Sequence, residues 1–258
     1  RYYQQAAIQG SVTALLRVAD GYRSEDAAKA FSFYSAAAEQ GSQEGRLRLS
    51  ELMIRGEGTK RNELAGMAEL EALATSDNPA VLEALAELCL SGRIRLQPTL
   101  ALTALDRATR LGSVSSHRRL GDLYSAGEDV KADYALALDH YRQAAGQGNA
   151  DAEIRLAEMQ ARGQGMQQDV AAAEASLKAL AGKGSTGALL ALGDLYGQAE
   201  AMPFDPALAM KYYSAAAAQG SITALLRLAQ GYADGRFGRR DLKEAERHYQ
   251  LAFETGNP

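Results

Sequence analysis

Apolar and polar positions recur along this chain with a period close to 36 residues. The segment from Tyr2 to Tyr22 returns almost unchanged as the segment from Tyr212 to Tyr232. A small closing residue marks the end of each period, at Gly41, Asp77, Gly112, Gly148, Gly184, Gly220 and Gly256. A fixed period of this length indicates a protein built from stacked copies of one module.

Each period predicts two helices. A serine or asparagine follows the closing residue and is a good N-cap for a first helix. Ala188, Leu192 and Tyr196 show the pattern that comes next, in which spacings of four place a small, a leucine-like and an aromatic residue on one helix face. A glycine ends the first helix, and an aspartate such as Asp205 begins the second. The predicted units are approximately 11–41, 42–77, 78–112, 113–148, 149–184, 185–220 and 221–256, within one domain of residues 1–258.

The pattern A-x-x-x-L-G-x-L-Y, nearly complete from Ala188 to Tyr196 and present from Ser116 to Tyr124, resembles the Sel1-like repeat family, which is of the tetratricopeptide type. The resemblance implies an all-α fold, a right-handed α-α superhelix of about seven helix pairs. Leu70 and Leu105 depart from it, because they replace the aromatic residue of the second helix. The connection 93–96 also departs from it, because it lacks the second glycine.

The two ends of the sequence also fit the repeat. Arg1 enters within a second helix, and Asn257 and Pro258 resemble the first residues of another first helix. We therefore expect this sequence to be part of a longer repeat array.

Composition narrows the function further. A chain of 258 residues with 47% hydrophobic and 23% charged residues can bury a substantial core. Its net charge of -4 gives little electrostatic support for nucleic acid as the main ligand. No apolar run is long enough to span a bilayer, so we expect no direct membrane insertion in this segment. The single cysteine, Cys89, cannot form an internal disulfide and is expected to be buried.

Residues for catalysis or metal binding do not converge in the sequence. His140 and His248 occupy the same place in two repeats, 108 residues apart, which is too far along a stack to share a metal. His117 lies on a first helix, and no nucleophile-elbow, Walker or dinucleotide motif is present. We therefore predict a protein that is not an enzyme and has no cofactor and no metal.

An arginine row on the first helices is the first candidate binding surface. The arginines lie three residues after the small residue in five units, at Arg17, Arg48, Arg119, Arg155 and Arg227. Helix geometry points them to solvent, and the resemblance places first helices on a concave surface. One interpretation is a track for an acidic protein segment or a uronate-bearing polysaccharide. The other is internal pairing with the acids three residues further on, which are Asp20, Glu51, Glu87, Asp122, Glu158 and Asp194.

The connections between the two helices of a pair are the second candidate. They gather basic and aromatic residues, in particular Phe204, Arg236, Phe237, Arg239 and Arg240, with Lys60, Arg61, Arg93, Arg95 and Lys131 in other connections. Exposed aromatic residues among arginines suit a protein-binding hot spot. The alternative is that charge merely solvates these loops while both phenylalanines fold back onto the core.

The sequence thus predicts a non-enzymatic adaptor that holds protein partners in a multiprotein assembly. The alternative is direct binding of an acidic polysaccharide along the arginine row. The family resemblance implies a bacterial envelope assembly such as exopolysaccharide export, alginate export included. It also implies a periplasmic or outer-membrane-associated location, with the cytoplasm as the alternative.

Overall fold

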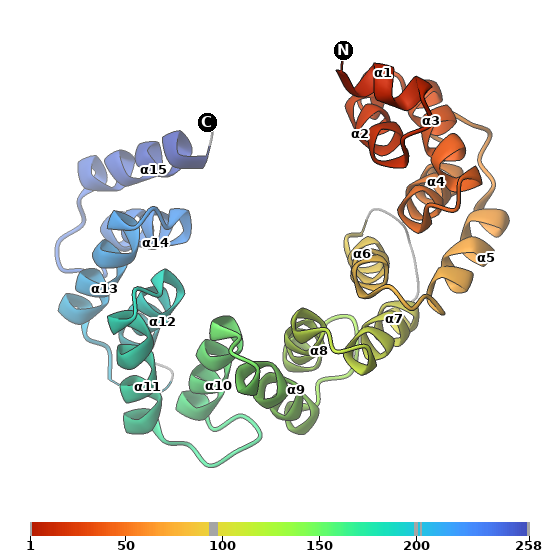
Figure 1. Cartoon of the computed structure of the whole chain (residues 1–258). Coiled ribbons are helices and arrows are strands. Elements are labelled where there is room, and N and C mark those ends of the chain that lie inside the picture. The colour runs from red at the N-terminus through yellow and green to blue at the C-terminus, as the bar shows by residue number, and fades with distance from the viewer. Residues whose placement is uncertain (1, 93–97, 199–200, 202, 257–258) are drawn as a thin grey trace. The chain divides into compact units, whose positions relative to one another are not determined.

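The computed structural model describes residues 2–92, 98–198, 201 and 203–256, and these residues form fifteen α-helices and no strand (Figure 1). The predicted all-α fold is confirmed. The predictions made for Arg1, Asn257 and Pro258, and for the connection at Arg93 and Arg95, lie outside the described residues. The chain divides into two compact units, Arg1–Ala132 and Asp133–Pro258.

The first unit consists of eight helices that pack consecutively, each against the one before it. The first helices α2, α4, α6 and α8 lie on one side, and the second helices α3, α5 and α7 lie on the other (Figure 1). The helices are α1 (Tyr2–Ile8), α2 (Val12–Tyr22), α3 (Ala27–Glu39), α4 (Gln43–Arg55), α5 (Glu63–Leu73), α6 (Pro79–Leu90), α7 (Pro98–Arg110) and α8 (Val114–Ala126).

The second unit repeats this plan with seven helices. The first helices α10, α12 and α14 form one layer, and α11, α13 and α15 form the other (Figure 1). The helices are α9 (Tyr134–Gly146), α10 (Ala150–Arg162), α11 (Val170–Gly182), α12 (Thr186–Gly197), α13 (Pro206–Ala218), α14 (Ile222–Asp234) and α15 (Leu242–Gly256). None of the described helices is both long enough and apolar enough to cross a membrane.

The predicted helix boundaries follow from capping. The side chains of Ser185 and Ser221 accept hydrogen bonds from backbone N–H groups of α12 and α14, and Asp205 does the same for α13. Gly163 and Gly235 end α10 and α14 in the left-handed conformation, with φ of 69° and 73°. The sequence pattern therefore specifies where these helices start and stop.

The core forms where small residues of one helix meet large residues of the next. Tyr34 and Tyr213 are buried on α3 and α13, and Ala37 and Ala216, one turn further along, are fully buried. Leu105 replaces the aromatic residue of α7 and is also fully buried, so this departure keeps the packing. Cys89 is buried as expected, and burial raises the pKa of its thiol to about 11.

A carboxylate connects two first helices in the first unit. Glu83 on α6 accepts hydrogen bonds from the hydroxyls of Ser113, Ser115 and Ser116 at the start of α8, the last two at 2.5 and 3.2 Å. Burial raises the pKa of Glu83, but the serine hydrogen bonds and the charge of Arg119 outweigh burial and hold it below its usual value. The charged form of Glu83 therefore stabilises the folded state.

We predict that Glu83→Gln lowers the free energy of unfolding by about 1 kcal/mol at pH 7, because an amide accepts these bonds more weakly than a carboxylate on a partly exposed site. Because the folded-state pKa lies below 4.5, this contribution is complete above pH 4.5 and is lost as the pH falls through the folded-state value. Urea denaturation across this range measures the difference. Glu71→Gln, at an exposed glutamate of α5, is the control, and an equal loss there at every pH would contradict the assignment.

The two duplicated segments, around α2 and α14, carry a glycine at the same position, Gly21 and Gly231, but the neighbours of these two glycines differ. A Cβ on Gly231 would lie 2.0 Å from the Phe237 ring, whereas a Cβ on Gly21 would meet nothing within 4 Å. Phe237 thus lies directly on the backbone of α14.

We predict that Gly231→Ala displaces the Phe237 ring and lowers the free energy of unfolding by about 1 to 3 kcal/mol. Gly21→Ala should be neutral, or stabilising by up to about 1 kcal/mol, because alanine favours the helix. Urea denaturation of both variants checks this, and equal effects would show that Phe237 does not press on α14.

Candidate binding site in the second unit

Three arginines of the predicted row are ion-paired. Arg119 on α8 reaches Glu87 on α6 at 3.4 Å, Arg155 pairs with Glu158 within α10 at 2.9 Å, and Arg227 on α14 reaches Asp194 on α12 at 3.2 Å. Internal pairing, one of the two interpretations of the row, is therefore confirmed at these positions.

The other two arginines of the row differ from these. Arg17 is exposed and has no ion pair among the described residues. Arg48 is half-buried, and its Nε atom has no hydrogen-bond partner in the described part of the chain. The expectation that the arginines all point freely to solvent is wrong for Arg48, because the helix packing covers part of its side chain.

The acids of the row also bind tyrosines, which the sequence analysis treated only as packing residues. The Tyr213 hydroxyl donates to Asp194 Oδ1 at 2.8 Å, and the Tyr34 hydroxyl donates to Asp20 at 2.6 Å. Burial, together with the adjacent carboxylate, raises the pKa of both tyrosines. The signal was present in the sequence, because an acid on the first helix and a tyrosine on the second recur together.

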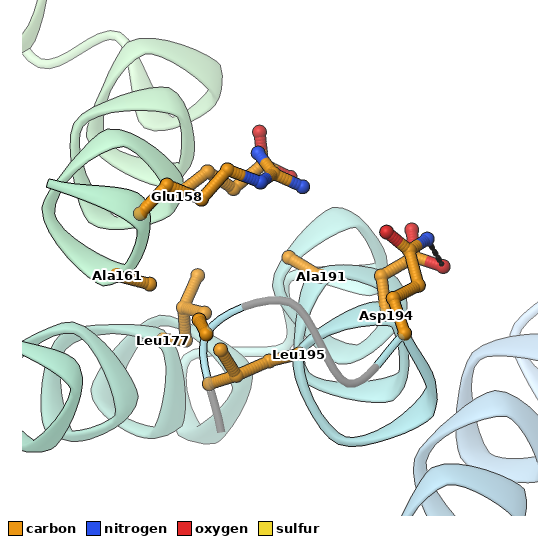
Figure 2. Close-up of a pocket in the computed structure, with 9 residues that line it drawn as sticks. Glu158, Ala161, Leu177, Ala191, Asp194 and Leu195 are labelled. Atoms are coloured by element: carbon orange, nitrogen blue, oxygen red, sulfur yellow. Dashed lines mark hydrogen bonds between the residues drawn. The ribbon is translucent and has the colours of Figure 1, made fainter. Parts of the chain in front are cut away.

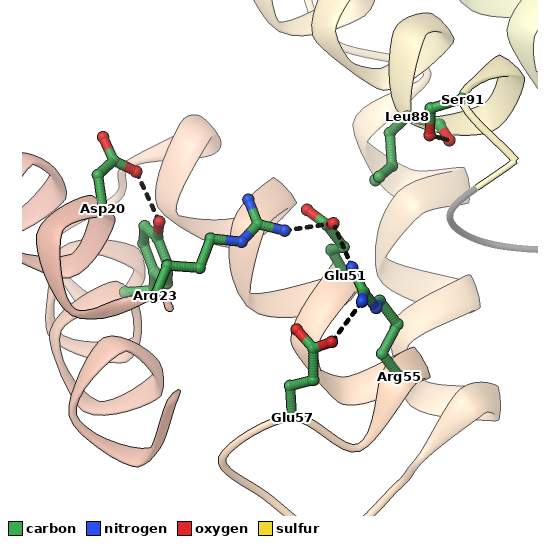
Figure 3. A network of polar contacts seen from close by, with 8 residues as sticks. Asp20, Arg23, Glu51, Arg55, Glu57, Leu88 and Ser91 are labelled. Carbon is green, nitrogen blue, oxygen red and sulfur yellow. Dashed lines mark hydrogen bonds and ion pairs between the residues drawn. The ribbon is translucent and has the colours of Figure 1, made fainter. Parts of the chain in front are cut away.

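A second polar network surrounds Glu51 on α4, whose side chain is fully buried (Figure 3). Arg23 and Arg55 both pair with this carboxylate, and Arg55 also lies 2.5 Å from Glu57. Burial alone would lower the pKa of Arg23, but its hydrogen bond with Glu51 outweighs burial and raises it. The guanidinium groups of Arg23 and Arg55 are thus engaged in ion pairs within the fold.

A small apolar cavity lies between α10, α11 and α12 (Figure 2). We call it the leucine pocket, and Ala161, Leu177, Ala191, Leu195 and Ala201 line it, with Glu158, Arg162, Asp194 and Gln198 around them. Its volume of about 20 Å³ is enough for on the order of one water-sized group.

A second cavity lies between α12, α13 and α14 and shares Gln198 with the leucine pocket. We call it the arginine pocket, and its volume is about 50 Å³. The lining residues are Gly197, Gln198, Phe204, Tyr213, Arg227, Gln230, Gly231, Arg236 and Phe237. Four predicted site residues, Phe204, Arg227, Arg236 and Phe237, are therefore brought together here, although the sequence placed them in two separate candidates.

The two phenylalanines of the arginine pocket behave differently. Phe204 is 41% exposed at the pocket. Phe237 packs against the core and contacts the rings of Tyr213 and Tyr232, with centroids 6.4 and 5.7 Å apart. The interpretation that the phenylalanines fold back is confirmed for Phe237, whereas Phe204 remains exposed.

Two guanidinium groups, those of Arg227 and Arg236, line the arginine pocket. Burial and the adjacent Asp194 carboxylate raise the pKa of Tyr213 there, and the charges of the two arginines only partly oppose this rise. Arg239 and Arg240, in the same connection as Arg236, are exposed and have no ion pair among the described residues. Such a site suits binding of a negatively charged group. Within the described residues, no three His, Cys, Asp or Glu side chains are placed to hold a metal ion.

We predict that Tyr34→Phe costs more stability than Tyr213→Phe, both in the range of about 0.5 to 2 kcal/mol. The reason is that Asp194 keeps hydrogen bonds from Arg227 and Gln198 when the Tyr213 hydroxyl is removed. Tyr249→Phe is the matched control, because Tyr249 holds the same repeat position but is 45% exposed. Urea denaturation measures all three, and an equal loss for Tyr249→Phe would contradict the role of the carboxylates.

Comparison with known proteins places this repeat in a family. The Sel1 repeat model matches residues 1–11, 17–42, 114–149, 150–175, 186–221 and 222–257. The unmatched stretch contains Leu70 and Leu105, yet the helix pairs continue through it as α4 to α7. No curated protein matches the sequence.

Two solved structures are similar to the chain. A Sel1 repeat protein from Oxalobacter formigenes is 27% identical with a TM-score of 0.63, and the match covers 99% of this chain and 75% of that one. A protective antigen of uropathogenic Escherichia coli with an SLR fold is 25% identical with a TM-score of 0.58, and the match covers 99% of this chain and 56% of that one. The predicted α-α superhelix is thereby confirmed, and the chain belongs to the Sel1 repeat family.

Proposed function

We propose that this chain is an adaptor that binds a segment of a protein partner across the leucine pocket and the arginine pocket of its second unit. Sel1 repeat proteins generally mediate protein–protein interaction and are generally non-enzymatic scaffolds. One observation carries the proposal for this chain. The exposed Phe204 ring lies at the same cavity as Arg227 and Arg236, and a small apolar cavity adjoins it through Gln198.

A protein segment fits this arrangement better than a polysaccharide does. A uniformly acidic polymer needs a continuous row of free cations, but Arg119 and Arg155 each have an acidic partner within the fold. The two pockets instead combine apolar and polar lining residues, and they share Gln198. A peptide offers both kinds of side chain in one segment, and aromatic and arginine residues are enriched at such interfaces.

The location and the assembly extend this proposal. We retain the bacterial envelope, in an assembly such as exopolysaccharide secretion, as the expected setting, with the cytoplasm as the alternative. The matched proteins described above are not named as exopolysaccharide-export proteins, so this setting rests on the sequence resemblance alone. Fractionation of the source cells into cytoplasm, periplasm and outer membrane, followed by immunoblotting, tests it.

We predict that the purified chain, used as bait, captures a protein partner that a Phe204→Ala, Arg236→Gln bait captures at least about tenfold less well, because loss of an aromatic anchor and a charged contact weakens an interface. Mass spectrometry identifies the partner, and calorimetry with the purified partner measures its affinity for both baits.

The control bait carries Leu64→Ala, which removes an apolar side chain of the first unit that is 85% exposed, more than Phe204. Equal binding to all three baits would contradict a site in the second unit. Recovery of an acidic polysaccharide in place of a protein would favour the alternative function.

A further inference from the structure

We propose that the arginine pocket is a carboxylate site, in which Arg227 and Arg236 together bind the side chain of an aspartate or glutamate in the partner segment. This inference rests on the proposed function and specifies the chemistry of the partner. An apolar neighbour of that acidic residue would lie against the exposed Phe204 ring.

The first step in the argument is the unused part of the Arg227 guanidinium. Arg227 contacts Asp194 through Nε at 3.2 Å, and its terminal nitrogens have no partner among the described residues. Arg236 approaches Asp234 through Nε as well, and only to 3.9 Å. A guanidinium whose terminal N–H groups remain free can still donate to an incoming carboxylate, for which its planar geometry is well suited.

Asp194 orients Arg227 and leaves its terminal N–H groups for an incoming group. A single oxygen, Oδ1, accepts from Tyr213 at 2.8 Å, from Gln198 at 2.9 Å and from Arg227 at 3.2 Å. Asp194 thus serves one guanidinium and two neutral donors, and it acts as a positioning residue. Arg236 has its own acidic neighbour, Asp234, and the excess positive charge comes from the exposed Arg239 and Arg240 of the same connection.

The walls of the pocket strengthen such a contact. Phe237 packs on Gly231 and Tyr213 and closes the inner side with apolar surface, while Phe204 borders the opening. A charged hydrogen bond is stronger next to apolar walls than in open water, because the local dielectric is lower. The volume of about 50 Å³ suits a group of a few atoms such as a carboxylate.

Charge around the pocket favours an acidic segment. Residues 222–240 contain four arginines, Arg227, Arg236, Arg239 and Arg240, against one acid, Asp234. The complete chain carries a net charge of -4, so this is a local reversal of sign. Such a local field attracts acidic partners and raises their association rate.

The duplicated segment supplies a built-in comparison. Arg17 occupies the place of Arg227 in an almost identical helix, and it is also exposed. The connection after α2 has no phenylalanine, and its arginine, Arg23, is held by the buried Glu51. If an arginine on a first helix were sufficient for binding, Arg17 would bind as well as Arg227.

The test uses the complete chain, immobilised, and two heptapeptide libraries blocked at both ends. The central residue is glutamate in one library and glutamine in the other, and the remaining positions are random. Mass spectrometry identifies retained peptides, and fluorescence anisotropy gives their affinities. We expect retention of the glutamate library with enrichment of apolar residues beside the glutamate. We also expect at least about a tenfold loss of affinity in the Arg227→Gln, Arg236→Gln variant and a change of less than about twofold in Arg17→Gln.

Circular dichroism and the melting temperature establish that each variant is folded. As a second variant, Phe204→Ala should remove the apolar enrichment while leaving the preference for glutamate over glutamine. This separates loss of a binding contact from loss of the fold, because Phe204 is exposed and the preference is measured within one protein.

Several results would overturn the carboxylate site. They are equal retention of the two libraries, an equal loss in Arg17→Gln, or competition by polygalacturonate that Arg17→Gln weakens as much as the double variant does. The two proposals can fail separately. Capture of a protein partner that is unchanged in the Arg227→Gln, Arg236→Gln variant would remove the carboxylate site and leave the adaptor, whereas retention of the glutamate library without any captured protein would do the reverse.

Discussion

Within each of the two units, neighbouring helix pairs bury apolar surface against one another, and the rest of the structure depends on this packing. Fully buried alanines such as Ala37 and Ala216 let the helices approach each other closely, and tyrosines such as Tyr34 and Tyr213 fill the remaining space. A pair cannot bury these surfaces alone, so stability is shared between neighbours. The same constraint fixes which residues of a first helix remain available for binding.

The acids of the first helices, among them Asp20, Glu51 and Asp194, add polar contacts to this apolar packing. Asp194 ties α12 to α13 through Tyr213 and to α14 through Arg227. Asp20 and Glu51 make comparable connections to Tyr34 and Arg23 in the first unit. The Tyr34 and Tyr213 hydroxyls and the Arg23 guanidinium thus gain charged partners, which are worth more than neutral ones in this environment. Much of the positive charge that the sequence displays is therefore used to hold repeats together.

Most of the fold could be predicted from the sequence, because its signals are local. Capping residues such as Ser185 and Asp205 and terminating glycines such as Gly163 act within one helix turn, and the structure places helix ends at them. The candidate site could be predicted only in part. An arginine on a first helix has acids within reach both along its own helix and on the neighbouring first helix, and the sequence does not decide between them. Arg155 pairs with an acid of its own helix, whereas Arg227 pairs with an acid of the neighbouring first helix.

The position of Phe237 was also beyond sequence reasoning. It depends on a glycine on α14, Gly231, against which the ring can lie, and on the path of the connection that brings the ring there. The meeting of Arg227 with Arg236 follows from the same path. Residues far apart in a repeat pattern become neighbours through one connection, which the periodicity itself does not describe.

The twin segments around Arg17 and Arg227 have a consequence for how such proteins diversify. Two nearly identical helices carry the same arginine, but the connections that follow α2 and α14 differ, and the one after α14 brings Phe237 and Arg236 to the cavity that Arg227 lines. A repeat array of this kind can gain or lose a recognition site by exchanging a few loop residues, while the helices keep their sequence and their stability. Evolution can then alter what one repeat binds without disturbing its neighbours.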